Sequence, residues 1–309
     1  MEPLTLRPMQ PADRWDVADL ICVSTNYWYQ THGRPAIFSG GAETTVVFFD
    51  VYEALDPGCG VVAMDAATGR LAGSCFFHPR PTHVSLGIMN VHPNHAGRGV
   101  ASRLLKYIIE AADRQQKPLR LVSSAMNLDS FSLYTRAAFV PQTVFQDMCL
   151  AVPPDGLPAG LADTRIVREA TAADIADMVA LEMEVAGVSR QKDFEYFLAN
   201  RDGFWHASVR CDARGELEGF LVSCGHHGCN MIGPGAALSG EAMLPLVAAE
   251  LDRHRGRTPV MLVPVQCAPL VQALYRWGGR NCETHFSQVR GPASPLHGVH
   301  MPTFLPESA

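Results

Sequence analysis

The chain has 309 residues, of which 47% are hydrophobic, and a formal net charge of −6. This length predicts two domains, and the composition excludes a largely disordered chain. No apolar run approaches the roughly 18 residues of a membrane-spanning helix, which argues against a membrane protein. The sequence has no Lys/Arg-rich stripe, which argues against a nucleic-acid partner.

Nine cysteines are scattered through the chain at irregular spacing. An odd number without a regular pattern is typical of a reducing compartment and not of a disulfide framework. The N-terminal residues show neither the basic nor the apolar region of a secretory signal. We therefore expect a cytoplasmic location.

The first half of the chain alternates strand and helix patterns, which predicts an α/β fold. The clearest element is the helix Gly99–Ala112, in which Val100, Leu104 and Ile108 share one face. The other predicted helices are Ala12–Tyr29, Ala42–Leu55 and Asp129–Ala137. The predicted strands are Leu4–Arg7, Val61–Met64, Leu71–His78, Val84–Val91, Leu119–Ser123 and Val144–Val152.

A Pro- and Gly-rich segment without periodicity, Pro153–Thr164, is predicted to be a linker. The residues beyond it repeat those near the N-terminus at a constant offset of 161, which indicates a duplicated domain. The repeated residues are Arg7, Ala12, Asp13, Asp16 and Leu20, which recur as Arg168, Ala173, Asp174, Asp177 and Leu181. A second echo relates Leu133-Tyr134 to Leu274-Tyr275.

These patterns predict a first domain over residues 1–152, a linker over 153–164, a second domain over 165–290 and a C-terminal tail over 291–309. The tail has no regular periodicity, so we expect it to be irregular. It carries a stiff apolar segment that is unlike the composition of disordered ends, so we also expect it to be docked. That segment consists of Pro302, Phe304, Leu305 and Pro306.

The stretch Ile88–Leu105 predicts a strand, a glycine-bearing turn and an amphipathic helix in direct succession. Such a turn leaves backbone N–H groups unpaired at the positive end of the helix dipole, where an anion such as a pyrophosphate binds well. Gly97 and Gly99 let a ligand approach the backbone closely. This feature alone is weak evidence, because glycine also serves simple chain reversal.

The segment Ala96–Ala101 resembles the acyl-CoA loop of the GNAT superfamily of N-acetyltransferases, Gln/Arg-x-x-Gly-x-Gly/Ala, with Ala96 in place of the first residue. Ala138 likewise replaces a usual glycine in a second similar motif, formed by Asn127, Ser130, Leu133, Tyr134 and Phe139. The resemblance is specific over residues 1–152 and weak over 165–290. It implies two tandem GNAT-like acyl-CoA N-acyltransferase domains. The fold class that it implies is α/β, with an α+β mixed sheet.

The resemblance also implies roles for individual residues. The strand backbone of Met89, Asn90 and Val91 would face the pantetheine arm and the thioester of the cofactor. The pyrophosphate would be bound by Gly97, Arg98, Gly99, Val100, Ala101 and Ser102. Asn127 and Ser130 would contribute to cofactor binding, and Tyr134 would protonate the departing thiolate, which a phenol of pKa near 10 can do.

The reaction that this resemblance implies is acetyl transfer from acetyl-CoA, by direct attack, to an amine of a small molecule or peptide, with no metal. Two alternatives remain open: a non-catalytic acyl-CoA-binding or regulatory protein, and an enzyme with two CoA sites. We expect neither nucleic acid nor membrane as a partner, and a homodimer stays open. The proton acceptor also stays open among His83, His92, Asp50 and Glu53.

The second domain is predicted to be degenerate. Gly233-Pro234-Gly235 stands where its phosphate loop is expected, and Pro234 lacks an N–H donor. The segment Cys224–Cys229 contains two cysteines and two histidines, which suits zinc. Its glycines favour a hairpin instead, because six residues rarely supply four ligands to one ion.

Overall fold

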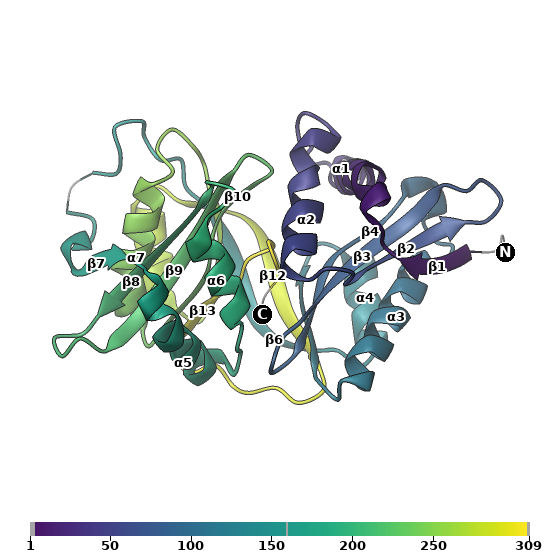
Figure 1. Cartoon of the computed structure of the whole chain (residues 1–309). Coiled ribbons are helices and arrows are strands. Elements are labelled where there is room, and N and C mark those ends of the chain that lie inside the picture. The colour runs from purple at the N-terminus through teal and green to yellow at the C-terminus, as the bar shows by residue number, and fades with distance from the viewer. Residues whose placement is uncertain (1–3, 159, 308–309) are drawn as a thin grey trace. The chain divides into compact units, whose positions relative to one another are not determined.

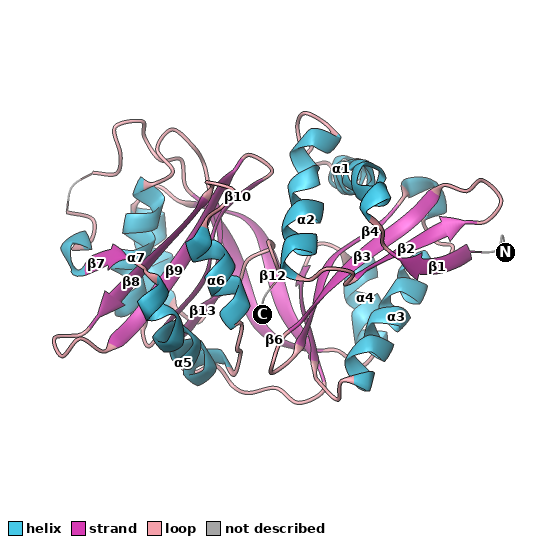
Figure 2. Ribbon diagram, in the orientation of Figure 1, coloured by secondary structure: helices cyan, strands magenta, loops and turns pink. Residues whose placement is uncertain are grey.

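The computed structural model describes residues 4–158 and 160–307, so the outermost residues of the first domain and of the tail, and residue 159 of the linker, lie outside the described part. The chain divides by internal contacts into two units. Among the described residues, unit 1 comprises 4–79, 83–119 and 304–307, and unit 2 comprises the remainder. Both units contain helices as well as strands (Figures 1 and 2).

Unit 1 contains an antiparallel sheet with the strand order β1-β2-β3-β4. In Figure 2, α1 and α2 cover one face of this sheet and α3 covers the other. The strands are β1 Leu4–Pro8, β2 Gly60–Asp65, β3 Leu71–Pro79 and β4 Val84–Val91, and the helices are α1 Arg14–Thr31, α2 Ala42–Leu55 and α3 Val100–Arg114.

The amphipathic pattern explains the position of α3. Val100, Leu104 and Ile108 are at most 1% exposed, whereas Lys106 on another face of the helix is exposed. A helix with such a narrow apolar stripe gains stability only by packing that stripe on a partner, here β3 and β4. The packing fixes the N-terminus of α3 beside the end of β4.

Unit 2 contains the sheet order β5-β12-β6-β11-β10-β9-β8-β7, and β13 pairs with β10. Its strands are β5 Leu119–Ser124, β6 Val140–Cys149, β7 Val167–Glu169, β8 Trp205–Cys211, β9 Leu217–His226, β10 Cys229–Ala237, β11 Val260–Pro264, β12 Arg280–Arg290 and β13 Val299–Met301. Its helices are α4 Leu128–Arg136, α5 Ile175–Ala186, α6 Gln191–Ala199, α7 Gly240–Asp252 and α8 Ala268–Arg276. The division between the units falls within β5, after Leu119.

The element order confirms the internal repeat. The series β1-α1-α2-β2-β3-β4-α3-β5-α4-β6 recurs as β7-α5-α6-β8-β9-β10-α7-β11-α8-β12. The residues that carry the sequence repeat also make equivalent contacts. Arg7 forms an ion pair of 2.7 Å with Asp13, and Arg168 forms one of 2.6 Å with Asp174.

The structure corrects the prediction at three places. β6 begins at Val140, before the predicted Val144. The tail is not irregular throughout, because Val299–Met301 forms β13, although its docking is confirmed by the full burial of Leu305. Gly233-Pro234-Gly235 lies inside β10 and is not the turn before α7, since β9 pairs with β10 on both sides of it.

The hairpin predicted over Cys224–Cys229 is confirmed, because β9 ends at His226, which pairs with Cys229 at the start of β10. None of the helices within the described residues has the length and the hydropathy that a membrane crossing requires. The nine cysteines all lie in the described part of the chain, and all of them are free thiols.

Candidate functional site

The turn between β4 and α3 occupies residues 92–99. Gly97 and Gly99 have φ angles of +74° and +79°, which favour glycine, and Gly99 is the N-cap of α3. An added Cβ at either glycine would meet open space. Because glycine has no side chain with which to cap a helix, the first N–H groups of α3 are available to an anion.

Of the predicted loop residues, one is buried, one is half-buried and the others are exposed. Val100 is buried and holds the helix against the sheet, whereas Ala101 is half-buried. The side that faces solvent consists of Gly97, Arg98, Gly99 and Ser102. The loop therefore combines a fixed backbone with an open approach, as the binding of a pyrophosphate requires.

β4 is irregular directly before the predicted thioester site. Met89 pairs with Cys75 and Leu86 pairs with Phe77, so two residues of β4 oppose one residue of β3. Such a β-bulge bends the strand and turns its backbone groups away from the regular ladder. Beyond the bulge, one edge of Met89–Val91 pairs with β3.

The side chain of Asn90 is buried and donates from Nδ2 to the hydroxyl of Ser24 in α1, at 2.8 Å. Its Oδ1 atom is also buried and has no hydrogen-bond partner among the described residues. A buried acceptor without a partner costs free energy unless a ligand or water completes it. Asn90 is thus positioned by α1 and offers an acceptor at the predicted site.

The remaining predicted site residues lie in unit 2. Asn127 is the N-cap of α4, and its Oδ1 accepts from the backbone N–H of Ser130 at 3.0 Å. Tyr134, also on α4, is 6% exposed, with its ring 5.7 Å from that of Phe139. The Oδ1 atom of Asn127 therefore has a structural role as the cap of α4.

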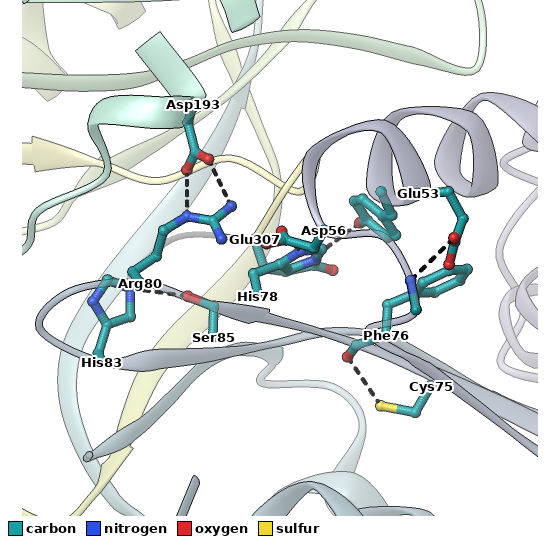
Figure 3. A network of polar contacts seen from close by, with 12 residues as sticks. Glu53, Asp56, Cys75, Phe76, His78, Arg80, His83, Ser85, Asp193 and Glu307 are labelled. Atoms are coloured by element: carbon teal, nitrogen blue, oxygen red, sulfur yellow. Dashed lines mark hydrogen bonds and ion pairs between the residues drawn. The ribbon is translucent and has the colours of Figure 1, made fainter. Parts of the chain in front are cut away.

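A buried polar network in unit 1 was not predicted from the sequence (Figure 3). His78 at the end of β3 contacts Asp56 at 2.8 Å. The ring of His78 lies 4.6 Å from that of Tyr52, whose hydroxyl donates to Glu307 at 2.7 Å. A Cβ at Gly87, in the bulge of β4, would lie 2.8 Å from Nε2 of His78. The network therefore reaches the strand that carries the predicted thioester site.

Burial raises the pKa of Glu307 to about 8. A carboxyl group with this pKa exchanges its proton near neutral pH, which is a property of acid–base catalysts. Glu307 lies in the tail, where no motif marks it, and only its proximity to Tyr52 in the folded chain reveals it. The sequence offered no signal that could have found it.

The four proton acceptors left open by the sequence each have a polar partner. These partners are Arg14 for Asp50, the backbone N–H of Gly58 for Glu53, Ser85 for His83 and the backbone N–H of Asn94 for His92. His83 is also buried, and Asp50 is half exposed. Each of these four side chains therefore makes a contact that contributes to the fold.

Two further buried clusters belong to unit 2. Arg80 pairs with Asp193 at 2.6 Å, and both side chains are 2% exposed (Figure 3). Within the described residues, Asp147, Glu283 and His285 lie close enough together to hold a metal ion. Within this cluster His285 hydrogen-bonds to Asp147 at 3.0 Å.

The turn between β10 and α7 is the counterpart of the glycine turn in the second repeat. It consists of residues 238–239 alone. Ser239 is the N-cap of α7, and its hydroxyl accepts from the backbone N–H of Ala242 at 3.1 Å. A side chain of the protein itself therefore occupies an N–H group that an anion would need.

Comparison with known proteins agrees with this geometry. Residues 25–139 match the model of the acetyltransferase (GNAT) family. The chain therefore contains a GNAT domain. No curated protein sequence matches the chain. The GNAT match ends within the first repeat, so the relation of the second repeat rests on structure.

Solved structures extend the likeness over nearly the whole chain. A GCN5-related N-acetyltransferase from Sphaerobacter thermophilus is 17% identical, with a TM-score of 0.66, and the match covers 96% of this chain and 98% of that one. A tandem GNAT protein from the clavulanic acid biosynthesis pathway is 15% identical, with a TM-score of 0.62 and coverage of 94% and 100%. A Pyrococcus horikoshii protein assigned to the acetyltransferases has a TM-score of 0.72 at 16% identity, with coverage of 96% and 92%. At these identities the likeness shows a shared fold, a tandem pair of GNAT-like domains.

Proposed function

We propose that the protein transfers an acetyl group from acetyl-CoA to an amine of a small molecule or peptide, in the cytoplasm. The GNAT match supports acyl transfer from an acyl-CoA. The observation that carries the proposal is the β4–α3 turn, whose left-handed glycines and uncapped helix N-terminus suit a pyrophosphate. We assign the pyrophosphate to Gly97–Ser102 and the thioester to the backbone of Met89–Val91.

The reaction needs two proton transfers. Attack by the amine places charge first on the thioester oxygen and then on the departing sulfur. We assign protonation of the sulfur to Tyr134, and contacts with the cofactor to Asn127 and Ser130. We propose Glu307 as the group that takes the proton from the ammonium form of the acceptor, because its network adjoins the bulge of β4.

The test is titration calorimetry with CoA, followed by an assay that detects the free thiol released from acetyl-CoA with a panel of amines. We expect one equivalent of CoA per chain and turnover with at least one amine. Two equivalents would favour the enzyme with two CoA sites. Tight binding without turnover on any amine would favour the regulatory alternative, and the absence of binding would contradict the proposal.

A separate measurement tests Glu307. Glu307→Gln keeps the size of the side chain and removes its titratable proton. We therefore expect kcat/KM to fall, and its pH profile to lose the step at a pKa near 8. Asp50→Asn, which alters an exposed carboxylate of the same unit, is the control and should keep the wild-type profile. An unchanged pH profile in Glu307→Gln would remove Glu307 from the mechanism.

A further inference from the structure

β10 has different partners along its two edges. β9 pairs with one edge on both sides of the irregularity at Gly233-Pro234. On the other edge, Met231 and Ile232 pair with β11, whereas Gly235–Ala237 pairs with β13. Because a strand has only two edges, β13 must lie on the same edge as β11. β10 and β11 therefore separate as a fork, and β13 occupies it.

This fork has a counterpart in the first repeat. β10 leads into α7 as β4 leads into α3, and β9 pairs with β10 as β3 pairs with β4. Gly235–Ala237 thus corresponds to Met89–Val91, where the proposed function places the pantetheine arm. We propose that the chain's own C-terminal strand, β13, permanently occupies the cofactor position of the second repeat, so that this repeat binds no acyl-CoA of its own. This inference rests on the proposed function of the first repeat.

Side-chain burial shows that β13 is a part of unit 2 and not a loosely attached end. Val299 and Met301 are at most 2% exposed and belong to the hydrophobic core of this unit. His300 points into a buried ion pair, with Nε2 3.4 Å from Glu182, which also pairs with Arg190. Loss of this strand would expose apolar surface and leave buried charges uncovered.

The backbone at both ends of β13 packs closely against the strand β10 or its end. A Cβ added at Gly298 would lie 2.4 Å from the carbonyl oxygen of Ala237. A Cβ added at Gly233 would lie 2.6 Å from the carbonyl oxygen of Pro302. Real Cβ atoms do not make contacts this short, so the tail and β10 approach too closely at these two glycines for any side chain to fit between them.

Hydrogen–deuterium exchange on the full chain, with and without saturating CoA, tests the inference. We expect amides of 235–237 and 299–301 to exchange slowly and to the same extent in both states. CoA should slow exchange only in the first repeat, at 89–91 and 97–102. Slowed exchange at 235–237, or faster exchange at 299–301, on addition of CoA would show that CoA displaces β13 and would overturn the inference.

The same experiment separates the inference from the proposed function. If CoA changes amide exchange nowhere in the chain, the proposed function fails. The docking of β13 is then tested separately, by the rate of amide exchange at 299–301 without CoA. Fast exchange there without CoA would overturn the permanent docking.

A full-length variant sharpens the test. Gly298→Ala must displace the backbone at the start of β13, so we expect exchange at 235–237 to accelerate at least tenfold. His297→Ala, an exposed neighbour, is the matched control and should leave exchange unchanged. Unchanged exchange in Gly298→Ala would contradict the position assigned to β13.

Discussion

The turns that precede α3 and α7 occupy equivalent places in the two repeats and differ in what they leave unpaired. The turn over residues 92–99 is long, contains left-handed Gly97 and Gly99, and presents an uncapped helix N-terminus. The turn over residues 238–239 is short, and Ser239 caps the helix. The same fold is thus open to an anion in one repeat and completed by the protein itself in the other.

The strands before these turns differ in the same way. In the second repeat, β9 pairs with one edge of Gly235–Ala237 and β13 pairs with the opposite edge. In the first repeat, the equivalent backbone of Met89–Val91 follows a bulge, and Asn90 keeps a buried acceptor without a partner among the described residues. The backbone edge that pairs with β13 in the second repeat thus corresponds to the segment Met89–Val91 of the first repeat. Together with the proposed inference on β13, the comparison predicts that a duplicated domain loses a ligand site through added contacts as well as through lost residues.

The largest expected effect concerns the tyrosines of the two repeats. Tyr134 is 6% exposed, whereas its counterpart Tyr275 is 47% exposed. If Tyr134 protonates the departing thiolate, Tyr134→Phe should lower kcat by about 10²-fold or somewhat less, with little change in acetyl-CoA affinity. Tyr275→Phe, the matched control, should leave kcat unchanged.

Steady-state kinetics with a second acyl donor refines this prediction. A donor with a more acidic thiol needs less protonation, so the loss of kcat that Tyr134→Phe causes with this donor should be smaller. Equal losses for both donors would indicate positioning instead of acid catalysis, and an unchanged kcat would make Tyr134 a structural residue.

A somewhat smaller effect is expected at the first turn. Gly99→Val forces an unfavourable backbone conformation and places a side chain where the pyrophosphate approaches. We expect at least a tenfold loss of CoA affinity by calorimetry, about 1.4 kcal/mol. Gly69→Val is the control, because Gly69 has a similar φ angle of +68° in a turn between β2 and β3. Equal losses in both variants would mean that strain, and not the ligand, is responsible.

At the second turn the effect should fall on stability. Ser239→Ala removes the cap of α7 and should lower the free energy of unfolding of unit 2 by about 1 kcal/mol. CoA affinity should not change. Ser102→Ala, on the exposed side of α3, should leave stability unchanged. A loss of CoA affinity in Ser239→Ala would place the cofactor in the second repeat and contradict the comparison.

The smallest effect concerns the ion pairs that the repeats share. Arg7→Ala and Arg168→Ala should each lower the free energy of unfolding by up to about 1 kcal/mol, with the larger loss at Arg7, which is less exposed. Denaturation with urea measures both. Lys106→Ala, which removes an exposed pair with Glu110, should cost only a few tenths of a kcal/mol and serves as the control. A larger loss of unfolding free energy in Arg168→Ala than in Arg7→Ala would contradict this prediction.

The pH dependence of these pairs follows from the carboxylates. The hydrogen bond to Arg168 lowers the pKa of Asp174 to about 2, below its ordinary value of 3.8. Its contribution is therefore complete above about pH 4 and is lost as the pH falls through 2. As the pH falls through this range, the free energy of unfolding of the Arg168→Ala variant should approach that of the wild type. A difference in this free energy that persists at pH 2 would contradict the assignment.

The elements of the first repeat were predictable because their patterns are local. The bounds of α2 and β4 agree with the prediction, and α3 differs from it by one or two residues. In each case the apolar period and the flanking Gly or Pro define the element without help from distant residues. The glycine turn was predictable for the same reason, as its backbone conformation depends on the glycines themselves.

The sequence by itself therefore determined the α/β class, the duplication and the GNAT resemblance, because periodic apolar spacing, the offset repeat and contiguous motifs are all written along the chain. The domain boundaries at 152 and 165 and the individual site roles stay predictions. Only the tertiary structure decided what the tail does. The pairing of β13 with Gly235–Ala237 and the contact of Tyr52 with Glu307 join residues far apart in sequence. Such contacts depend on strand edges and burial that exist only in the folded chain, and no local pattern encodes them.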